Sequence, residues 1–171
     1  MSASHHLLTF DAPYAILNLD WMTTLIAAIE DTPQGQTFIS TASIGMTHLS
    51  FNPNQPEVQL SSPFAKLIAP YGEFTTDSHD AQIDKRLQVD KFDIVLQKTR
   101  WSAMAGNPLE QILRAKGIRS VVVTGLSLSG VVMSTVYRLS DLDYNVYMIR
   151  DNVLELPVEQ TAEVAHVMMD I

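Results

Sequence analysis

The chain has 171 residues, a formal net charge of −8 at pH 7 and no cysteine. Its length suits one domain, expected to cover residues 1–171, and its acidic character makes nucleic acid an unfavourable partner because phosphate backbones would be repelled. The lack of cysteine excludes disulfides, thiolate metal sites and thiol catalysis together.

Short apolar runs alternate with helical patterns along the chain, and this order predicts βαβ units and a parallel sheet. In the first half, the patterns predict a strand over Tyr14–Asp20, a helix over Trp21–Glu30 and a strand near Ile44–Leu49. Residues 52–90 are rich in proline and polar residues, so we expect long loops there with one short helix at Pro63–Ile68. Loops of this length in a compact domain often form a lid or the rim of a binding site.

The second half of the chain carries sharper signals for strands and helices. The predicted elements are a strand over Phe92–Lys98, a helix over 107–117, a buried strand over Arg119–Gly125, a helix over Gly130–Asp141, a strand over Tyr144–Asp151 and a helix from Pro157. Asn107 is suited to cap the first of these helices, Pro108 suits its first position, and Glu110 is placed to reach back to the cap.

Together these elements predict an α/β fold: a three-layer, Rossmann-like, open and mostly parallel sheet with helices on both faces. In such sheets ligands bind at the carboxyl ends of the strands, at the point where the strand order reverses. Asp20, Lys98, residues 125–131 and Asp151 each follow a predicted strand. They are therefore the candidate site residues.

The segment "GLSLS" at residues 125–129 is one residue away from the G-x-S-x-G pattern of a serine nucleophile elbow. In that interpretation Ser127 is the nucleophile, and Asp151 and His166 follow in the required order of acid and then histidine. The second glycine of the pattern is Ser129 here, and the chain is short for that fold. The serine hydrolase is therefore the weakest of three interpretations, and Ser127 and Ser129 fit equally well as small loop residues before a helix.

Three blocks of sequence point to a known family. The blocks "AILNLD", "LQKTRWSAMAGNPLEQILRAKGI" and "SVVVTGLSLSGVVMSTVYRLSDLDYNVYMIRDN" resemble the isochorismatase-like family, also called the cysteine hydrolase superfamily. This resemblance implies an α/β hydrolase fold with the family's catalytic aspartate at Asp20 and its catalytic lysine at Lys98. It also implies a non-prolyl cis peptide in the nucleophile loop, which we expect near Gly130–Val131.

The main departure from the family lies in that loop, where the family cysteine aligns with Val131. A valine cannot form a thioester, so amidase chemistry through a covalent thiol intermediate is excluded. The isochorismatases of this family also lack the nucleophile. In them the aspartate is thought to protonate a vinyl ether before water attacks, and the resemblance therefore implies that Asp20 acts as a general acid.

Residues beside these positions complete the expected substrate pocket. Trp21 follows Asp20, Trp101 follows Lys98 closely, and we expect both to contact substrate. Ser129, Gly130 and Val132 are the expected substrate-binding positions of the loop. Backbone N–H groups from Gly130 to Val132, at the start of a helix, are suited to hold a carboxylate or an oxyanion.

Two functions from different classes follow. The first is a small-molecule hydrolase that uses Asp20 and Lys98 without a cysteine. The second is a catalytically inactive binding module, which a pocket plugged by Val131, Met104 or Leu128 would favour. Asp77 and His79 resemble a metal-binding pair of some family members, but no second histidine has a useful spacing. We therefore expect no metal and no cofactor.

Other expectations concern surroundings and partners. No run of about 18 apolar residues predicts a membrane span, and the N-terminus lacks the features of a signal peptide, so we expect a cytoplasmic protein. Family members are commonly dimers or tetramers, which implies a homodimer or a higher homo-oligomer. Glu155, Glu159 and Glu163 have the spacing of a solvated helix face.

Overall fold

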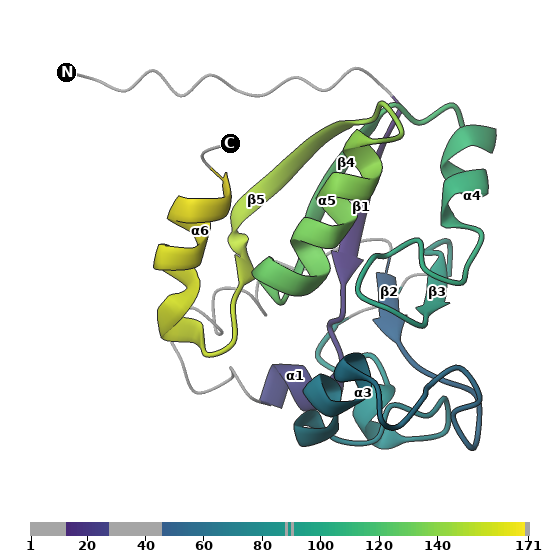
Figure 1. The fold of residues 1–171 in the computed structure, drawn as a ribbon. Helices are drawn as coiled ribbons and strands as arrows, with labels where there is room; N and C mark the ends of the chain where they lie inside the picture. The colour runs from purple at the N-terminus through teal and green to yellow at the C-terminus, as the bar shows by residue number, and fades with distance from the viewer. Residues whose placement is uncertain (1–12, 28–45, 88, 90, 170–171) are drawn as a thin grey trace.

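The fold is built on a five-stranded parallel sheet with the strand order β3-β2-β1-β4-β5 (Figure 1). A computed structural model describes residues 13–27, 46–87, 89 and 91–169. The strands are β1 (Tyr14–Leu19), β2 (Met46–Leu49), β3 (Val95–Lys98), β4 (Ser120–Leu126) and β5 (Asn145–Leu154). Every pair of neighbouring strands is parallel, which confirms the α/β fold predicted from the sequence.

Five α-helices are described between and after the strands. They are α1 (Thr23–Ala27), α3 (Pro63–Ile68), α4 (Leu109–Ala115), α5 (Met133–Ser140) and α6 (Thr161–Met169). Short 3₁₀ turns cover Ala69–Tyr71, His79–Ala81 and Val158–Gln160, and a π-helical turn covers Leu128–Val132 before α5. The helix predicted at Pro63–Ile68 is confirmed, whereas residues 28–30 of the helix predicted over Trp21–Glu30 lie outside the described residues.

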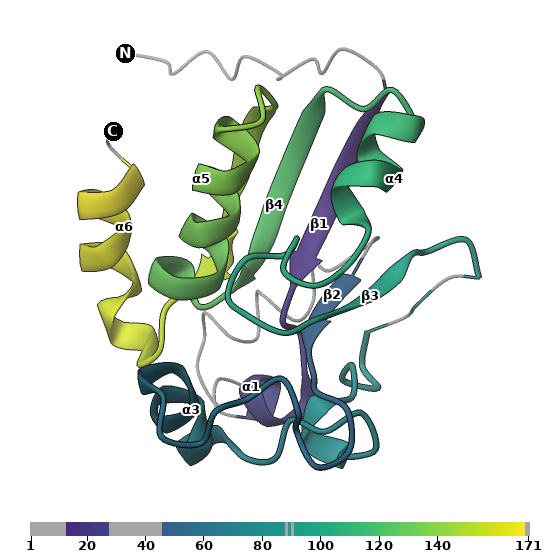
Figure 2. The same cartoon turned by 45° about the vertical axis from the view of Figure 1, so that its right-hand side comes forward.

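A hydrophobic core joins α4, α5 and α6 to one face of the sheet. Because side chains alternate across a strand, Leu17 and Leu19 of β1 and Val121 and Val123 of β4 all point to this face. Leu113 of α4 is buried against them in the same cluster. Each such side chain contributes about 1.5–3 kcal/mol by leaving water. Figure 2 shows α5 running beside β4 and α4 lying beside β1.

Asn107 fixes the start of α4, as expected. Its Oδ1 accepts a hydrogen bond from the backbone N–H of Leu109 at 3.0 Å. The expected return bond from Glu110 does not form, because that carboxylate bonds to Arg114 at 3.0 Å and to Arg138 at 3.5 Å. Opposite charges four residues apart on the helix and on neighbouring α5 therefore attract Glu110 away from the cap.

Strand β5 ends three residues later than the sequence predicts, since it continues beyond Asp151 to Leu154. Its pairing with β4 shifts register between Val123 and Gly125 and then resumes. Asp151 is consequently an exposed residue within the strand, and the residue that follows the carboxyl end of β5 is Glu155. This extension changes which acidic residue reaches the candidate site.

Candidate functional site

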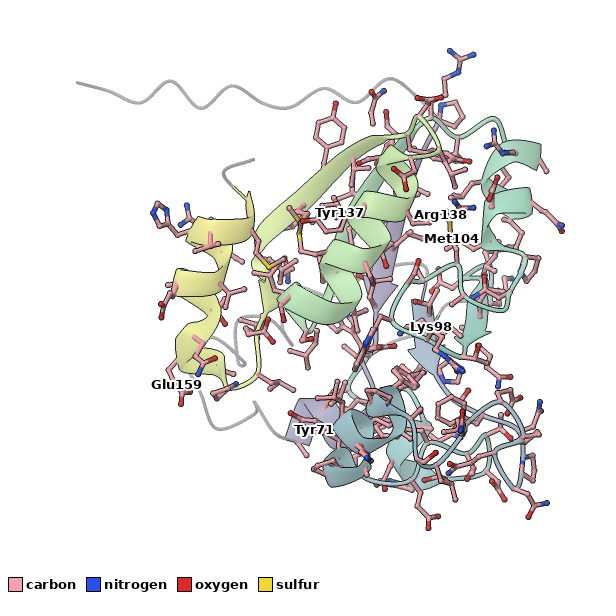
Figure 3. The ribbon with its side chains drawn as sticks, in the orientation of Figure 1. Tyr71, Lys98, Met104, Tyr137, Arg138 and Glu159 are labelled. Carbon is pink, nitrogen blue, oxygen red and sulfur yellow. The ribbon has the colours of Figure 1, made fainter. Side chains whose placement is uncertain are left out.

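Asp20 and Lys98 form a buried ion pair at the carboxyl ends of β1 and β3. The Nζ atom of Lys98 lies 2.7 Å from Oδ2 of Asp20, and the two residues are 0% and 1% exposed. Strand β2 lies between their two strands, so the pair forms across the sheet. Figure 3 shows Lys98 toward the end of the sheet near α3 and Tyr71.

Backbone groups complete the hydrogen bonding of this pair. Lys98 Nζ donates to the carbonyl oxygens of Arg100 at 3.0 Å and Trp101 at 3.1 Å, so an ammonium group has an acceptor for each of its three protons. Asp20 Oδ1 accepts from the backbone N–H of Leu49 at 3.0 Å. The loop after β3 and the end of β2 therefore fix both side chains.

Burial decides the protonation behaviour of the pair. It raises the pKa of Asp20 by disfavouring its charged form, although the nearby charge of Lys98 opposes this. Burial likewise lowers the pKa of Lys98, against the attraction of Asp20. Asp20 therefore holds a proton more readily than an exposed aspartate, which is what a general acid near neutral pH requires.

Asp20 lines a cavity of about 310 Å³ at this edge of the sheet. The residues around it are Asp20, Met22, Leu25, Leu49, Leu67, Ile68, Tyr71, Phe74, Trp101, Leu126, Ser127, Ser129, Gly130, Val131, Glu155 and Leu156. The cavity contacts the loops after β1 and β4, where the strand order reverses, and α3 supplies part of its wall. Its volume suits a small molecule, and its walls are mainly apolar.

The loop after β4 brings Val131, the predicted position of the family cysteine, into the cavity. Val131 lines it together with Ser127, Ser129 and Gly130. A Cβ atom at Gly130 would lie 3.0 Å from Ser127 Oγ, so the glycine permits a close approach there. The non-prolyl cis peptide of this loop is Leu126–Ser127, and the prediction of one near Gly130–Val131 is wrong.

Two backbone N–H groups at the start of this helix already have acceptors. The N–H of Val132 donates to the carbonyl oxygen of Ser127 at 3.0 Å, and the N–H of Ser129 donates to Oε2 of Glu155 at 2.7 Å. Val132 belongs to the segment from Gly130 to Val132 that was expected to hold an anion, and its N–H is occupied. The N–H of Ser129, directly before that segment, is occupied as well, so neither of these two donors is free for an oxyanion.

Glu155 is the site residue that sequence reasoning missed. It is 5% exposed and lines the cavity, so it does not belong to a solvated helix face. Its backbone N–H donates to Oγ1 of Thr161 at the start of α6. The spacing to Glu159 and Glu163 is helical, but the 3₁₀ turn begins only at Val158, after Glu155. Had the sequence analysis extended the predicted strand to Leu154, Glu155 would have followed its carboxyl end and would have counted as a candidate site residue.

Several other predicted residues lie elsewhere. Trp21 is 1% exposed and belongs to a second core cluster with Met22 and Phe51. The described residues that line the cavity include neither Trp21 nor Val132. Met104 and Leu128 pack with the core beneath α4 and α5 rather than in the cavity. Of the three residues expected to plug the pocket, only Val131 reaches it.

The members of the predicted serine triad are not gathered in one cavity. Ser127 lines the cavity with Asp20, whereas Asp151 lines a different depression between β5 and α6. His166 is exposed on α6 and lines neither of these two. The cavity therefore offers Ser127 the carboxylates of Asp20 and Glu155 but no histidine from the described part of the chain.

No group of three or more histidine, aspartate or glutamate side chains within the described ranges is arranged to hold a metal ion, around Asp77 and His79 included. None of the helices described is long and apolar enough to cross a bilayer.

Comparison with known proteins identifies the family to which this arrangement belongs. Residues 14–170 match the isochorismatase domain family, so the match includes each of the five strands described above and the candidate site. The chain belongs to the isochorismatase family. Its hydrolase fold, with Asp20, Lys98 and the loop around Val131 at one edge of the sheet, agrees with the blocks that carried the resemblance.

Two bacterial proteins, both named ureidoacrylate amidohydrolase RutB, are similar to part of this chain. Ureidoacrylate amidohydrolase RutB of Variovorax paradoxus is 35% identical over 77 residues, which is 45% of this chain and 31% of that protein. The protein of that name from Klebsiella pneumoniae strain 342 is 35% identical over 97 residues, which is 57% of this chain and 36% of the relative. The matched region spans about a third of these relatives.

Solved structures of the family share the fold. An N-carbamoylsarcosine amidase from Thermoplasma acidophilum superimposes with a TM-score of 0.69 at 20% identity, covering 90% of this chain and 91% of that one. An isochorismatase family protein from Burkholderia thailandensis gives a TM-score of 0.68 at 20% identity, covering 90% and 85%. At such identities the likeness establishes the fold.

Proposed function

We propose that the protein hydrolyses a small molecule by acid–base catalysis, with Asp20 as the proton donor, Lys98 as its partner and water as the nucleophile. The observation that carries this proposal is the buried pair with a 2.7 Å contact, whose carboxyl group lines a cavity of about 310 Å³. Catalysis through a thiol has no place in this proposal because the chain contains no cysteine and Val131 stands at the family position.

The reaction needs one carboxylic acid and one water molecule. Asp20 donates its proton to the substrate, for example to a vinyl ether, and this leaves an electron-poor carbon beside the scissile bond. Water adds to this carbon and returns a proton to Asp20. The adduct then collapses: the scissile bond breaks with its electrons on the leaving atom, which takes up the hydroxyl proton of the adduct. The carboxylate that exists between the donation and the return of the proton is stabilised by Lys98 and by the N–H of Leu49. The sum is hydrolysis with Asp20 regenerated.

The experiment is an activity panel with purified wild-type protein and the Asp20→Asn variant. Isochorismate is assayed by pyruvate release, while ureidoacrylate and nicotinamide are assayed by ammonia release. We expect turnover of at least one compound by the wild type and a loss of 100-fold or more in the variant, the size of effect typical of a general acid. Turnover that survives Asp20→Asn would contradict the proposal.

The second candidate function is a binding module without turnover. Two features favour it: Val131, which is predicted to stand at the nucleophile position, lines the cavity, and Glu155 accepts the hydrogen bond of the Ser129 N–H. This candidate would be supported if neither the wild type nor the variant turned over any compound of the panel while a ligand still bound in the cavity. Ser127→Ala belongs in the same panel. If Ser127→Ala lost all activity while Asp20→Asn kept it, the result would instead favour the serine hydrolase.

A further inference from the structure

The cavity contains one carboxylate whose charge is not neutralised by an ion pair within the described part of the chain. Glu155 accepts hydrogen bonds from the backbone N–H groups of Ser129 at 2.7 Å and Leu156 at 2.9 Å. No salt bridge joins it to a described lysine, arginine or histidine. Asp20, the other carboxylate of the cavity, is paired with Lys98.

The bonding of Glu155 leaves it able to bind a cation. A carboxylate offers about four acceptor positions, and the two backbone N–H groups occupy two of them. A buried charge is costly unless it is paired as well as hydrogen-bonded, and Glu155 is 5% exposed. A cationic group in the cavity would supply the missing partner.

The same carboxylate disfavours an anionic ligand. Ser129 lies in the first turn of the helical segment that begins at Leu128 and continues through α5, and N–H groups at the start of a helix attract anions. Glu155 already occupies this position. A ligand carboxylate there would compete for the N–H of Ser129 and would be repelled by Glu155.

Other charged side chains nearby do not alter this balance. Asp20 and Glu155 are the only charged residues among the described residues that line the cavity. Lys98 is held by Asp20 and two carbonyl oxygens, and Arg100 lies over the ring of Phe64 at 5.0 Å outside the cavity lining. The rest of the lining is dominated by apolar side chains such as Met22, Leu25 and Phe74.

We propose that the cavity selects a ligand with an apolar body and a cationic nitrogen group, of the amidinium or ammonium type, placed against Glu155. Where this ligand is the substrate, the inference rests on the proposed function and names the chemical class on which Asp20 acts. Glu155 is then the residue that determines specificity, and Thr161 positions it through its backbone.

The test measures binding rather than turnover, with three probes of nearly equal shape: benzamidine, benzamide and benzoate. They carry a positive, a zero and a negative charge at pH 7. We expect wild-type protein to bind benzamidine at least 10-fold more tightly than benzoate by calorimetry. Benzamidine should shift the amide NMR signals of Ser129 and Leu156, whose N–H groups bond to Glu155.

Two isosteric variants separate Glu155 from the general acidity of the chain. Glu155→Gln should weaken benzamidine binding at least 10-fold, change benzamide binding less than twofold and improve benzoate binding. Glu159→Gln removes the same charge from an exposed residue outside the cavity lining, and it should leave the order of the probes unchanged. Figure 3 shows Glu159 at the base of α6.

The wild-type ranking tests the inference even if a variant fails to fold. Benzoate binding as tight as benzamidine binding, or no measurable benzamidine binding, would overturn it. An equal loss for all three probes in Glu155→Gln would also overturn it. Asp20→Asn should keep the ranking while losing activity, so failure of the charge selectivity and failure of the acid mechanism are distinguishable.

Discussion

At the scale of single residues, the Asp20–Lys98 pair couples stability to chemistry. Lys98→Met leaves a buried carboxyl group without its partner, and Asp20→Asn leaves a buried ammonium. Breaking a buried pair by removing one partner costs about 3–5 kcal/mol. We therefore expect each single variant to lower the free energy of unfolding by about this amount.

The double variant Asp20→Asn/Lys98→Met should be more stable than the sum of the single changes predicts, because it leaves no isolated charge. Urea unfolding at pH 7 of the wild type, the two single variants and the double variant completes this double-mutant cycle. Additive losses would contradict the geometry in which the two groups lie 2.7 Å apart. Glu110→Gln, which removes the partly exposed ion pairs of Glu110 with Arg114 and Arg138, is the control and should cost less than about 1 kcal/mol.

The pKa of Asp20 gives the pH dependence a definite direction. Burial raises this pKa, so the proton that the acid donates is present at low pH and is lost as the pH rises through the raised pKa. We expect kcat/KM to fall on the alkaline side. Since Lys98 lowers the pKa of Asp20, Lys98→Met should move this fall to higher pH.

Carbon NMR of the Asp20 carboxyl group measures the same titration without any need for turnover. A midpoint at or below the ordinary value of 3.8 would contradict the assignment of Asp20 as a proton donor. A shift of the midpoint to lower pH in Lys98→Met would contradict the role of Lys98.

At the scale of elements, the loop between β3 and α4 holds the ion pair in place. Asn107 Nδ2 donates to the carbonyl oxygens of Gln97 at 2.9 Å and Ala103 at 2.7 Å, while its Oδ1 caps α4. The loop between these anchor points supplies the two carbonyl groups that accept from Lys98. The sequence marked Asn107 as a cap, but it gave no sign of this second role.

Asn107→Ala removes all three side-chain hydrogen bonds and should destabilise the protein by about 1–3 kcal/mol. Asn107→Asp keeps an acceptor for the N–H of Leu109 but loses the two hydrogen bonds that Asn107 donates. The stability that this variant loses therefore reports on the loop alone. Chemical unfolding and hydrogen exchange of residues 99–108 measure both effects. Unchanged exchange in Asn107→Asp would show that the loop does not depend on this side chain.

The elements also show why part of the site was predictable. Asp20 and Lys98 end apolar runs of ordinary strand length, and parallel strands bring their carboxyl ends to one edge. Glu155 was missed because Arg150 and Asp151 fit the end of a strand. Both are exposed in the edge strand β5, where polar residues are acceptable on the outward side, so β5 continues to Leu154. Trp21 was predicted in the pocket because it follows Asp20, but its large apolar side chain is buried instead.

At the scale of the whole molecule, the site depends on how closely the two central strands approach. Residues Tyr14–Leu19 of β1 pair with Ser120–Gly125 of β4, and the chains diverge just beyond into Asp20 and the loop that carries Ser127. Gly125 has φ +149°, and a Cβ atom there would lie 2.6 Å from Cβ and 2.7 Å from the carbonyl oxygen of Leu19. This contact is possible only for glycine, because a side chain would collide with the strand that carries Asp20.

Gly125→Ala should therefore disturb the sheet and the site together. Backbone strain of about 1–3 kcal/mol and an overpacking cost of similar size oppose the substitution, so we expect a loss of several kcal/mol in the free energy of unfolding. Gly117→Ala is the matched control: its φ is +64°, but nothing lies within 4 Å of the added Cβ. It should cost only about 1–2 kcal/mol from backbone strain.

Thermal and urea unfolding compare the stabilities of Gly125→Ala and Gly117→Ala, and benzamidine binding at low temperature reports on the cavity. Equal losses would mean that backbone conformation alone accounts for Gly125, whereas a larger loss in Gly125→Ala with weakened binding would tie the packing of β1 on β4 to the geometry of the site.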